Sequence, residues 1–339
     1  MRLLVLGGTT GLSGRVAVEA VGRGHDVVCA ARGRSGAVPD RARLIPVDRD
    51  EPGAVAVLVG ERFDAVVDVA TGALGWVRAV LDVLAGEGPD APHWTFVSSV
   101  NVYADVATPG QGVDAPLVPA VDDPRHLAPE ELTIETYGGT KVASEQAVRD
   151  RVGDGRALIV RPGIISGPGD VMDRFGYWAA RFARGGRTVI PDAPDQPIQH
   201  VDVRDLAAWL VTAAETRTAG VFDAVGPVLR LGDVLSAMAA TVGAGDLELV
   251  PMSEEALTGA GVQPWGGPAS LPLWLPTGYT GLAAHDPEPA AAAGLAGRSL
   301  TDVALTALAD ERARGMDRTR KAGLTLDEER TLLDGGRLT

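Results

Sequence analysis

Short apolar runs alternate with helix-like stretches over the first 165 residues of this 339-residue chain. The runs that have the length and composition of buried strands are residues 3–6, 26–31, 43–47, 64–69, 94–99 and 157–162. Between them, apolar residues recur at helical spacing in 12–23, 51–60, 73–86 and 134–151. An alternation of this kind produces a parallel sheet with helices on both faces. The pattern therefore predicts a doubly wound α/β domain.

The remainder of the chain has a different texture. Residues 104–133 are rich in proline, aspartate and alanine without a sustained period, so we expect a long surface loop there. An aromatic-bearing helix is predicted near 171–184, and the charged residues 314–339 predict a peripheral helix. The part that follows residue 166 is thus expected to form a separate, smaller lobe.

Composition excludes several classes of partner. The chain carries 45 acidic against 31 basic residues, and its formal net charge of −14 would repel the backbone of nucleic acid. No run of about 18 uncharged apolar residues occurs, so we expect neither a membrane span nor a signal peptide. Cys29 is the single cysteine and the five histidines are dispersed, which leaves no cluster with metal-ligand spacing. We expect a cytoplasmic protein with no metal, membrane or nucleic-acid partner.

The turn after the first run is rich in glycine. Gly8, Gly11 and Gly14 have the spacing GxxGxxG, and the following residues begin a helix. A strand that turns sharply into a helix presents backbone N–H groups to an anion, and side chains at the glycine positions would block a pyrophosphate. We therefore expect this turn, with Thr10 and Leu12 between the glycines, to hold the phosphates of a dinucleotide.

The end of the second run bears on which dinucleotide binds. A carboxylate at this position suits the free ribose of NAD(H), whereas the 2′-phosphate of NADP(H) needs an arginine. Residues 30–31 are alanines, and Arg32 and Arg34 follow. The sequence favours NADP(H), with NAD(H) possible. Asp48, beyond the third run, is placed either to meet the adenine amino group or to serve as a solvated turn residue.

Tyr137 and Lys141 are four residues apart in a predicted helix, so their side chains lie about one turn apart on one face. Only Lys141 and Lys321 among the 31 basic residues are lysines. A nearby ammonium favours the phenolate and lowers the pKa of a tyrosine. A slim ammonium can also reach a cofactor ribose where a fork-shaped guanidinium would not fit. We interpret Tyr137 as an acid–base group that Lys141 tunes.

Two polar residues follow the fifth run, at the edge of the sheet where ligands bind in such folds. Ser99 is expected to hold a substrate oxygen there. Asn101, the only asparagine in the chain, either forms a turn or donates a hydrogen bond to the substrate. Ser98 is interpreted as a packed residue at the strand end.

These motifs together resemble the extended short-chain dehydrogenase/reductase superfamily, in the branch called the NAD-dependent epimerase/dehydratase family. The resemblance rests on the glycine turn, Ser99-x-x-x-Tyr103, Tyr137-x-x-x-Lys141, "RPGIISGPGD" from Arg161, "VDVRDLA" from Val201 and "DPEPAAAAGLAGRSL" from Asp286. It implies a Rossmann sheet and the catalytic set Ser99, Tyr137 and Lys141. Contacts with the cofactor are expected from Val69, Ala70, Pro162, Ile164 and Ile165.

The resemblance also implies a division of the chain. Residues 1–165 would form the dinucleotide-binding domain, to which 199–226 return, and 166–339 would form mainly the substrate-binding lobe with C-terminal helices. The sequence departs from the family pattern at two places. An extra Gly7 precedes "TTGLSG", where an aromatic residue is usual, and no acidic residue follows Ser99, which disfavours 4,6-dehydratase chemistry.

We predict an NADP(H)-dependent oxidoreductase that reduces a carbonyl or related group of a small molecule. The residues expected to face the substrate are Asn101, Arg174, Trp178 and His200, and Trp265 and Trp274 are further candidates for an apolar wall. One alternative is a redox-neutral epimerase of a nucleotide sugar, with Arg174 and Arg204 on the diphosphate. Another is a cofactor-sensing protein without catalysis. A homodimer through the helices at 73–86 and 134–151 is possible.

Overall fold

Seven parallel strands form the central sheet of the computed structural model, which describes residues 1–70, 72–123, 125–128, 131 and 133–338. The strand order is β11-β6-β5-β4-β1-β2-β3. The strands are β1 (Arg2–Leu6), β2 (Asp26–Ala31), β3 (Arg43–Pro46), β4 (Ala65–Asp68), β5 (His93–Val97), β6 (Ala157–Pro162) and β11 (Gly220–Ala224). The order reverses between β1 and β4, and ligands bind at such a switch point, outside the carboxyl ends of the strands. The predicted doubly wound Rossmann sheet is confirmed.

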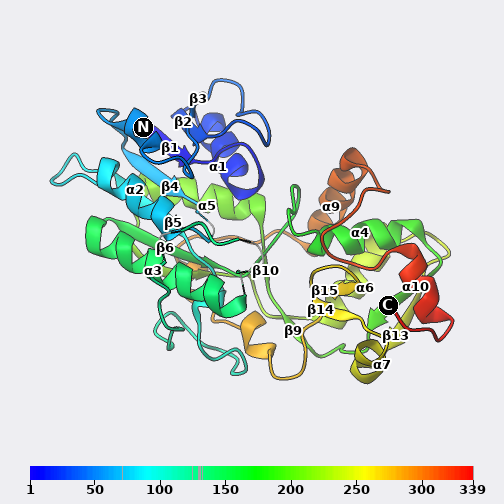
Figure 1. Cartoon of the computed structure of the whole chain (residues 1–339). Helices are drawn as coiled ribbons and strands as arrows, with labels where there is room; N and C mark the ends of the chain where they lie inside the picture. The colour runs from blue at the N-terminus through cyan, green and yellow to red at the C-terminus, as the bar shows by residue number, and fades with distance from the viewer. Residues whose placement is uncertain (71, 124, 129–130, 132, 339) are drawn as a thin grey trace.

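Helices cover both faces of this sheet (Figure 1). On one face α1 (Gly11–Gly22) packs against α5 (Val203–Thr216), and on the other α2 (Leu74–Leu84) packs against α3 (Ile134–Val152). The predicted helix at 51–60 is shorter than expected, since only the 3-10 turn η1 (Ala54–Leu58) forms there. Pro52 precedes this turn and Gly53 has a left-handed φ of 76°, and both disfavour a longer helix.

The seventh strand comes from the second half of the chain. After α5, strand β11 pairs in parallel with β6, from Gly220 opposite Leu158 to Ala224 opposite Pro162. This segment lies within residues 199–226, which were expected to return to the sheet. The boundaries assigned to the two domains stay a prediction.

A second layer of helices forms the C-terminal lobe, on the right in Figure 1. Helices α4 (Arg174–Arg184), α6 (Leu231–Val242) and α9 (Leu300–Arg314) pack on one another around Phe175, Trp178 and Phe182, none of which is exposed. The lobe also contains α7 (Glu254–Gly259) and α10 (Leu326–Leu333). Helix α8 (Glu288–Ala292), although late in sequence, packs beside β11 of the central sheet.

Four short strand pairs lie outside the central sheet. They are β7 (Ile164–Ser166) with β10 (His200–Asp202), β9 (Pro197–Ile198) with β12 (Leu229–Arg230), β8 (Arg187–Pro191) with β13 (Glu248–Met252), and β14 (Gln263–Trp265) with β15 (Ser270–Pro272). The 3-10 turns η2 (Val100–Val102) and η4 (Thr280–Ala283) complete the elements used below.

The long loop predicted at 104–133 contains no helix and no strand among its described residues, apart from turns and one bridge between Tyr103 and Leu117. Four of its positions, 124, 129–130 and 132, lie outside the described residues. Over the part of the chain that the structure describes, none of the helices combines the length and apolar character that a membrane span requires.

Candidate active site

A cavity of about 680 Å³ opens at the carboxyl edge of the sheet, between the sheet and the lobe. It is bounded by the glycine turn, the end of β5, helix α3, strands β6 and β7, and the start of α4. The residues predicted from the sequence that line it are Thr10, Gly11, Leu12, Val69, Ser99, Asn101, Tyr137, Lys141, Pro162, Ile164, Ile165 and Arg174. Most of the predicted site is therefore brought together in one place.

The glycine turn is shaped for close approach. A Cβ on Gly8 would collide with Cys29 on β2, and one on Gly14 would come within 3.3 Å of the Thr9 carbonyl carbon. These two glycines shape the turn from behind and do not line the cavity, whereas Gly11, with a left-handed φ of 53°, does. Helix α1 begins at Gly11 with no capping side chain and no acidic residue in its first turn. Its first amides are therefore available to an anion, which fits a dinucleotide pyrophosphate.

Ser99 and Tyr137 meet above the end of β5. Tyr137 and Ser99 both line the cavity, and the Ser99 hydroxyl acts to lower the pKa of the phenol. Ser99 Oγ donates to Asn101 Oδ1 at 2.9 Å and accepts the Asn101 backbone N–H at 3.2 Å. The N-terminal part of α3 presses on this turn so closely that a Cβ on Gly138 would collide with the Asn101 carbonyl oxygen. The glycine after the tyrosine thus lets the phenol reach the serine.

Lys141 is buried and has a different set of partners from those expected. Its Nζ donates to the backbone carbonyls of Ala70 and Val97, and it lies 5.9 Å from the centre of the Tyr137 ring. Burial lowers the pKa of Lys141 to about 8, although the nearby carboxylates of Asp68 and Glu145 oppose this effect. The ammonium is thus hydrogen-bonded to backbone carbonyls at or just beyond the ends of two strands. Ala70 provides one of these carbonyls but does not line the cavity.

The predicted lowering of the Tyr137 pKa by Lys141 is wrong for this structure. Burial raises the pKa of Tyr137, and the influences that oppose it are the Ser99 hydroxyl and the positive charge of Arg174. Sequence spacing placed lysine and tyrosine on one helix face, but the two carbonyl oxygens draw the ammonium toward the sheet.

Residues 3–224 match the model of the NAD dependent epimerase/dehydratase family. The chain belongs to this family. The resemblance to extended short-chain dehydrogenases/reductases is thereby confirmed, and members of this family are NAD-dependent enzymes. A comparison with curated protein sequences gave no match.

Solved structures share the fold of this family member. The enzyme WbmH of Bordetella bronchiseptica, in complex with NAD+, is 17% identical with a TM-score of 0.65, over 92% of this chain and 98% of that one. TunA, an NAD-dependent NDP-hexosamine 5,6-dehydratase of tunicamycin biosynthesis, is 18% identical with a TM-score of 0.67, over 94% and 99%. UDP-glucuronic acid 4-epimerase from Bacillus cereus, in complex with NAD, is 13% identical with a TM-score of 0.64, over 95% and 100%.

The residues expected to choose between the two cofactors lie outside the cavity. Arg32 and Arg34 are exposed beyond the end of β2, and a guanidinium nitrogen of Arg34 lies 3.9 Å from the Asp48 carboxylate. Asp48 also accepts the backbone N–H of Asp50 at 3.3 Å, as a turn aspartate does. No acidic residue stands at the end of β2.

Two of the residues predicted to face the substrate do not. Trp178 is completely buried in the core of the lobe, where its Nε1 donates to the Pro272 carbonyl at 2.9 Å. His200 lies behind the cavity wall, because its Nδ1 is 2.8 Å from the hydroxyl of Ser166, and its ring packs on Phe175. Burial lowers the pKa of His200 to about 4, so its imidazole is neutral at physiological pH. The prediction for Trp178 is wrong because aromatic bulk was interpreted as a pocket wall where it fills a core. His200 was placed at the pocket because it precedes the strand–helix junction, and it is instead the first residue of β10 and packs on Phe175.

Arg204 does not reach the cavity either. Its guanidinium is bonded to Asp202 at 2.8 Å and to Asp302 at 2.7 Å. The diphosphate-binding role considered for Arg204 is therefore not available in this arrangement. Trp265 does line the cavity, whereas Trp274 is buried in the lobe.

Several wall residues carried no signal in the sequence. Among the described residues, Thr133, Asp170, Gln199, Val225, Leu282 and Ala283 also line the cavity. Most come from loops or strand ends far from the motifs, and apolar side chains such as Leu282 have the same composition as any core residue. Among the described residues, no group of three or more histidine, cysteine or acidic side chains is placed to hold a metal ion.

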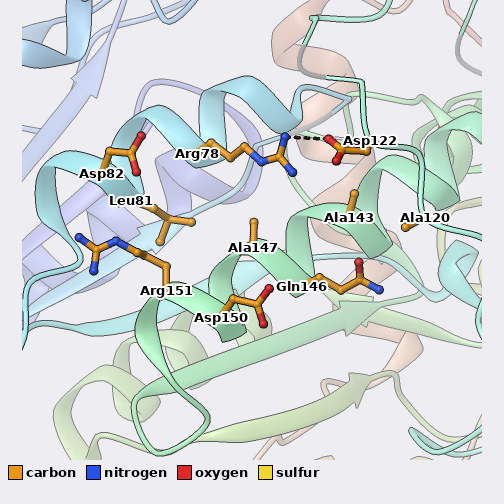
Figure 2. A pocket seen from close by; sticks show the side chains of 10 residues that line it. All are labelled: Arg78, Leu81, Asp82, Ala120, Asp122, Ala143, Gln146, Ala147, Asp150 and Arg151. Atoms are coloured by element: carbon orange, nitrogen blue, oxygen red, sulfur yellow. Dashed lines mark hydrogen bonds and ion pairs between the residues drawn. The ribbon is translucent and has the colours of Figure 1, made fainter.

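A second hollow, of about 480 Å³, lies between α2 and α3 and contains none of the predicted site residues (Figure 2). Arg78 of α2 crosses it to Asp122 at 2.7 Å, and the small residues Ala143 and Ala147 of α3 face it. These are the two helices through which a homodimer is predicted, and that association stays a prediction.

Proposed function

We propose that this family member is an oxidoreductase that transfers a hydride between a nicotinamide dinucleotide and the carbonyl or carbinol carbon of a small molecule. The observation that carries the proposal is that Ser99 and Tyr137 line one cavity together with the glycine turn. Tyr137 would donate a proton to the substrate oxygen while Ser99 holds that oxygen by a hydrogen bond. The bound dinucleotide would supply or accept the hydride.

Burial of Tyr137 supports the reduction direction. Because burial raises the pKa of its phenol, the hydroxyl keeps its proton in the resting protein and is ready to donate it. Lys141, held by the carbonyls of Ala70 and Val97, would orient the cofactor ribose from below. NADP(H) is the proposed cofactor, since alanines end β2 and the exposed Arg32 and Arg34 follow, although the structural relatives named above contain NAD.

A redox-neutral epimerase of a nucleotide sugar is the second candidate. It is supported by a relative of similar fold that is a UDP-glucuronic acid 4-epimerase, and by the presence of Arg174 on the cavity wall. An epimerase keeps its cofactor through the catalytic cycle, whereas a reductase exchanges it at every turnover. The fate of the cofactor therefore distinguishes the two.

The experiment is to denature the purified protein and measure the NAD(H) and NADP(H) that it releases. We expect a mostly empty protein that oxidises added NADPH when it is offered carbonyl compounds. Equimolar retained NAD, with turnover of UDP-sugars and no consumption of added cofactor, would establish the epimerase instead. If the Tyr137→Phe variant retained full biological activity, a cofactor-sensing protein without catalysis would be the better description.

A further inference from the structure

Arg174 is a cation without a protein partner. It is the first residue of α4 and lines the cavity, and its side chain is only partly exposed. Its Nε is fully buried and has no hydrogen-bond partner among the described residues. Also among the described residues, no carboxylate lies within 4 Å of the Arg174 guanidinium. Buried arginines are normally paired, because leaving the charge uncompensated is costly.

The surroundings of Arg174 hold the guanidinium in place, and the Asp170 carboxylate acts on its charge without forming an ion pair with it. The Trp265 ring stacks on it at 4.7 Å, and Trp265 itself has a left-handed φ of 69°, a strained conformation for a bulky residue. Strain of this kind is concentrated at ligand-binding sites. Gly266, which follows Trp265, lies beside the guanidinium, where a Cβ would come within 3.9 Å of Arg174 Nε.

The nearest acidic residue is already occupied. The Asp170 carboxylate accepts the backbone N–H of Met172 at 3.0 Å through one oxygen and that of Phe175 at 2.9 Å through the other. It therefore serves the start of α4. The remaining cation on the wall, Lys141, is bonded to two carbonyls. With Lys141 assigned to the cofactor ribose, Arg174 is the cation on the described wall that is left for the substrate.

We propose that Arg174 binds an anionic group of the substrate, a carboxylate or a phosphate monoester, that is carried within a few bonds of the carbon served by Ser99 and Tyr137. A guanidinium fork matches such groups with two parallel hydrogen bonds. The anion lies close to the reacting carbon because Arg174 and Tyr137 share the cavity wall, and the charge of Arg174 is felt at the phenol. A single arginine suits one anionic group better than a diphosphate. This inference rests on the proposed hydride-transfer function.

Binding is tested separately from turnover. The Tyr137→Phe variant, saturated with NADPH or NADH, is titrated calorimetrically with matched probes: 2-oxobutanoate against its methyl ester, and glycerone phosphate against glycerone. We expect one anionic member to bind at least about 100-fold more tightly than its neutral partner. The pair that shows this preference identifies the anion as a carboxylate or a phosphate.

A second substitution is then introduced into that variant. Arg174→Met should remove the preference for the anion, and Arg174→Lys should keep part of it, with a loss of about tenfold. Cofactor affinity should stay unchanged in both. The matched control is Arg184→Met, since Arg184 lies on the same helix but pairs with Asp317 at the surface. It should keep the full preference.

The outcomes separate the two proposals. Equal binding of the acid and its ester, a preference that survives Arg174→Met, or a loss confined to cofactor affinity would each overturn the assignment of Arg174. Tighter binding of UDP-glucose than of the carboxylate and phosphate-monoester probes would also overturn it, in favour of a diphosphate site. Arg174-dependent binding of an anion, with no oxidation of either cofactor by the unsubstituted protein, would uphold the anion site and refute the hydride-transfer function.

Discussion

The two walls of the cavity differ in how well sequence patterns located their residues. On the sheet wall, the glycine turn, Ser99, Tyr137 and Pro162 all lie where the order of strands and helices predicted. On the lobe wall, Arg174 and Trp265 line the cavity, whereas Trp178 and Trp274, which were also predicted there, are buried in the core. Strand ends in a parallel sheet are brought together by topology alone, whereas the residues that line the cavity from the lobe depend on side-chain packing.

Helix α4 illustrates the second case. Arg174 and Trp178 are four residues apart and share a helix face, yet the first lines the cavity and the second is buried in the core. Four residues advance a helix by about 6 Å, which is enough to pass from a cavity into a packed interior. The helix face assigned from sequence spacing does not show at which residue the cavity ends and the packed core begins.

The largest effect is expected at Tyr137 on the sheet wall, and Tyr177 in the lobe core serves as its control. Tyr137→Phe should lower kcat by about 10²–10⁴-fold, because the proton donor is lost, with little change in cofactor affinity. Tyr177→Phe should leave kcat unchanged, since Tyr177 lies in the lobe core and does not line the cavity. Steady-state kinetics of both variants is the measurement. Equal effects on kcat would contradict the placement of catalysis on the sheet wall.

A buried ion pair on each side offers a comparison of stability. Glu145 and Arg161 are joined through two hydrogen bonds of 3.0 and 2.7 Å beside the sheet, and Glu329 and Arg181 at 2.6 Å in the lobe. Glu145→Gln and Glu329→Gln should each lower the free energy of unfolding by about 3–5 kcal/mol, because each leaves a buried arginine uncompensated. Urea denaturation measures this. Of the two, only Glu145→Gln should also lower activity, since α3 carries Tyr137.

A loss of activity in Glu329→Gln as large as in Glu145→Gln would show that the lobe core and the sheet wall act as one unit. That result would weaken the contrast drawn between them.

The free energy of unfolding should depend on pH through Lys141. Burial lowers the pKa of Lys141 from 10.5 to about 8, so between these values the unfolded chain binds more protons than the folded protein. The free energy of unfolding should therefore rise as the pH increases from about 8 to 10.5, by roughly 3 kcal/mol relative to Lys141→Met. Denaturation curves across this range are the test. A parallel dependence in Lys141→Met would assign the rise to other groups.

The smallest effect is expected at the residue wrongly placed in the substrate pocket. Trp178→Phe should lower the free energy of unfolding by roughly 0.5–3 kcal/mol, through the cavity left by the smaller ring and the lost hydrogen bond to Pro272. The KM for substrate should not change. A raised KM with unchanged stability would restore Trp178 to the substrate wall.

The sequence by itself determined the doubly wound sheet, the position of the glycine turn and the neighbourhood of Ser99 and Tyr137. Alternating apolar runs and helical periods specify which segments become strands, and right-handed crossovers then bring their carboxyl ends to one edge.

The partners of the charged side chains follow from the tertiary structure and not from local sequence. Lys141 is hydrogen-bonded to two backbone carbonyls, and Arg204 pairs with two aspartates. Arg174 Nε has no hydrogen-bond partner among the described residues, and its guanidinium stacks on Trp265. Backbone hydrogen bonding within an element follows from local sequence. The partner of a charged side chain depends instead on segments far away along the chain, as for Arg204 and Asp302, which are separated by 98 residues. Such distant contacts form only when the core has packed, and no local pattern encodes them.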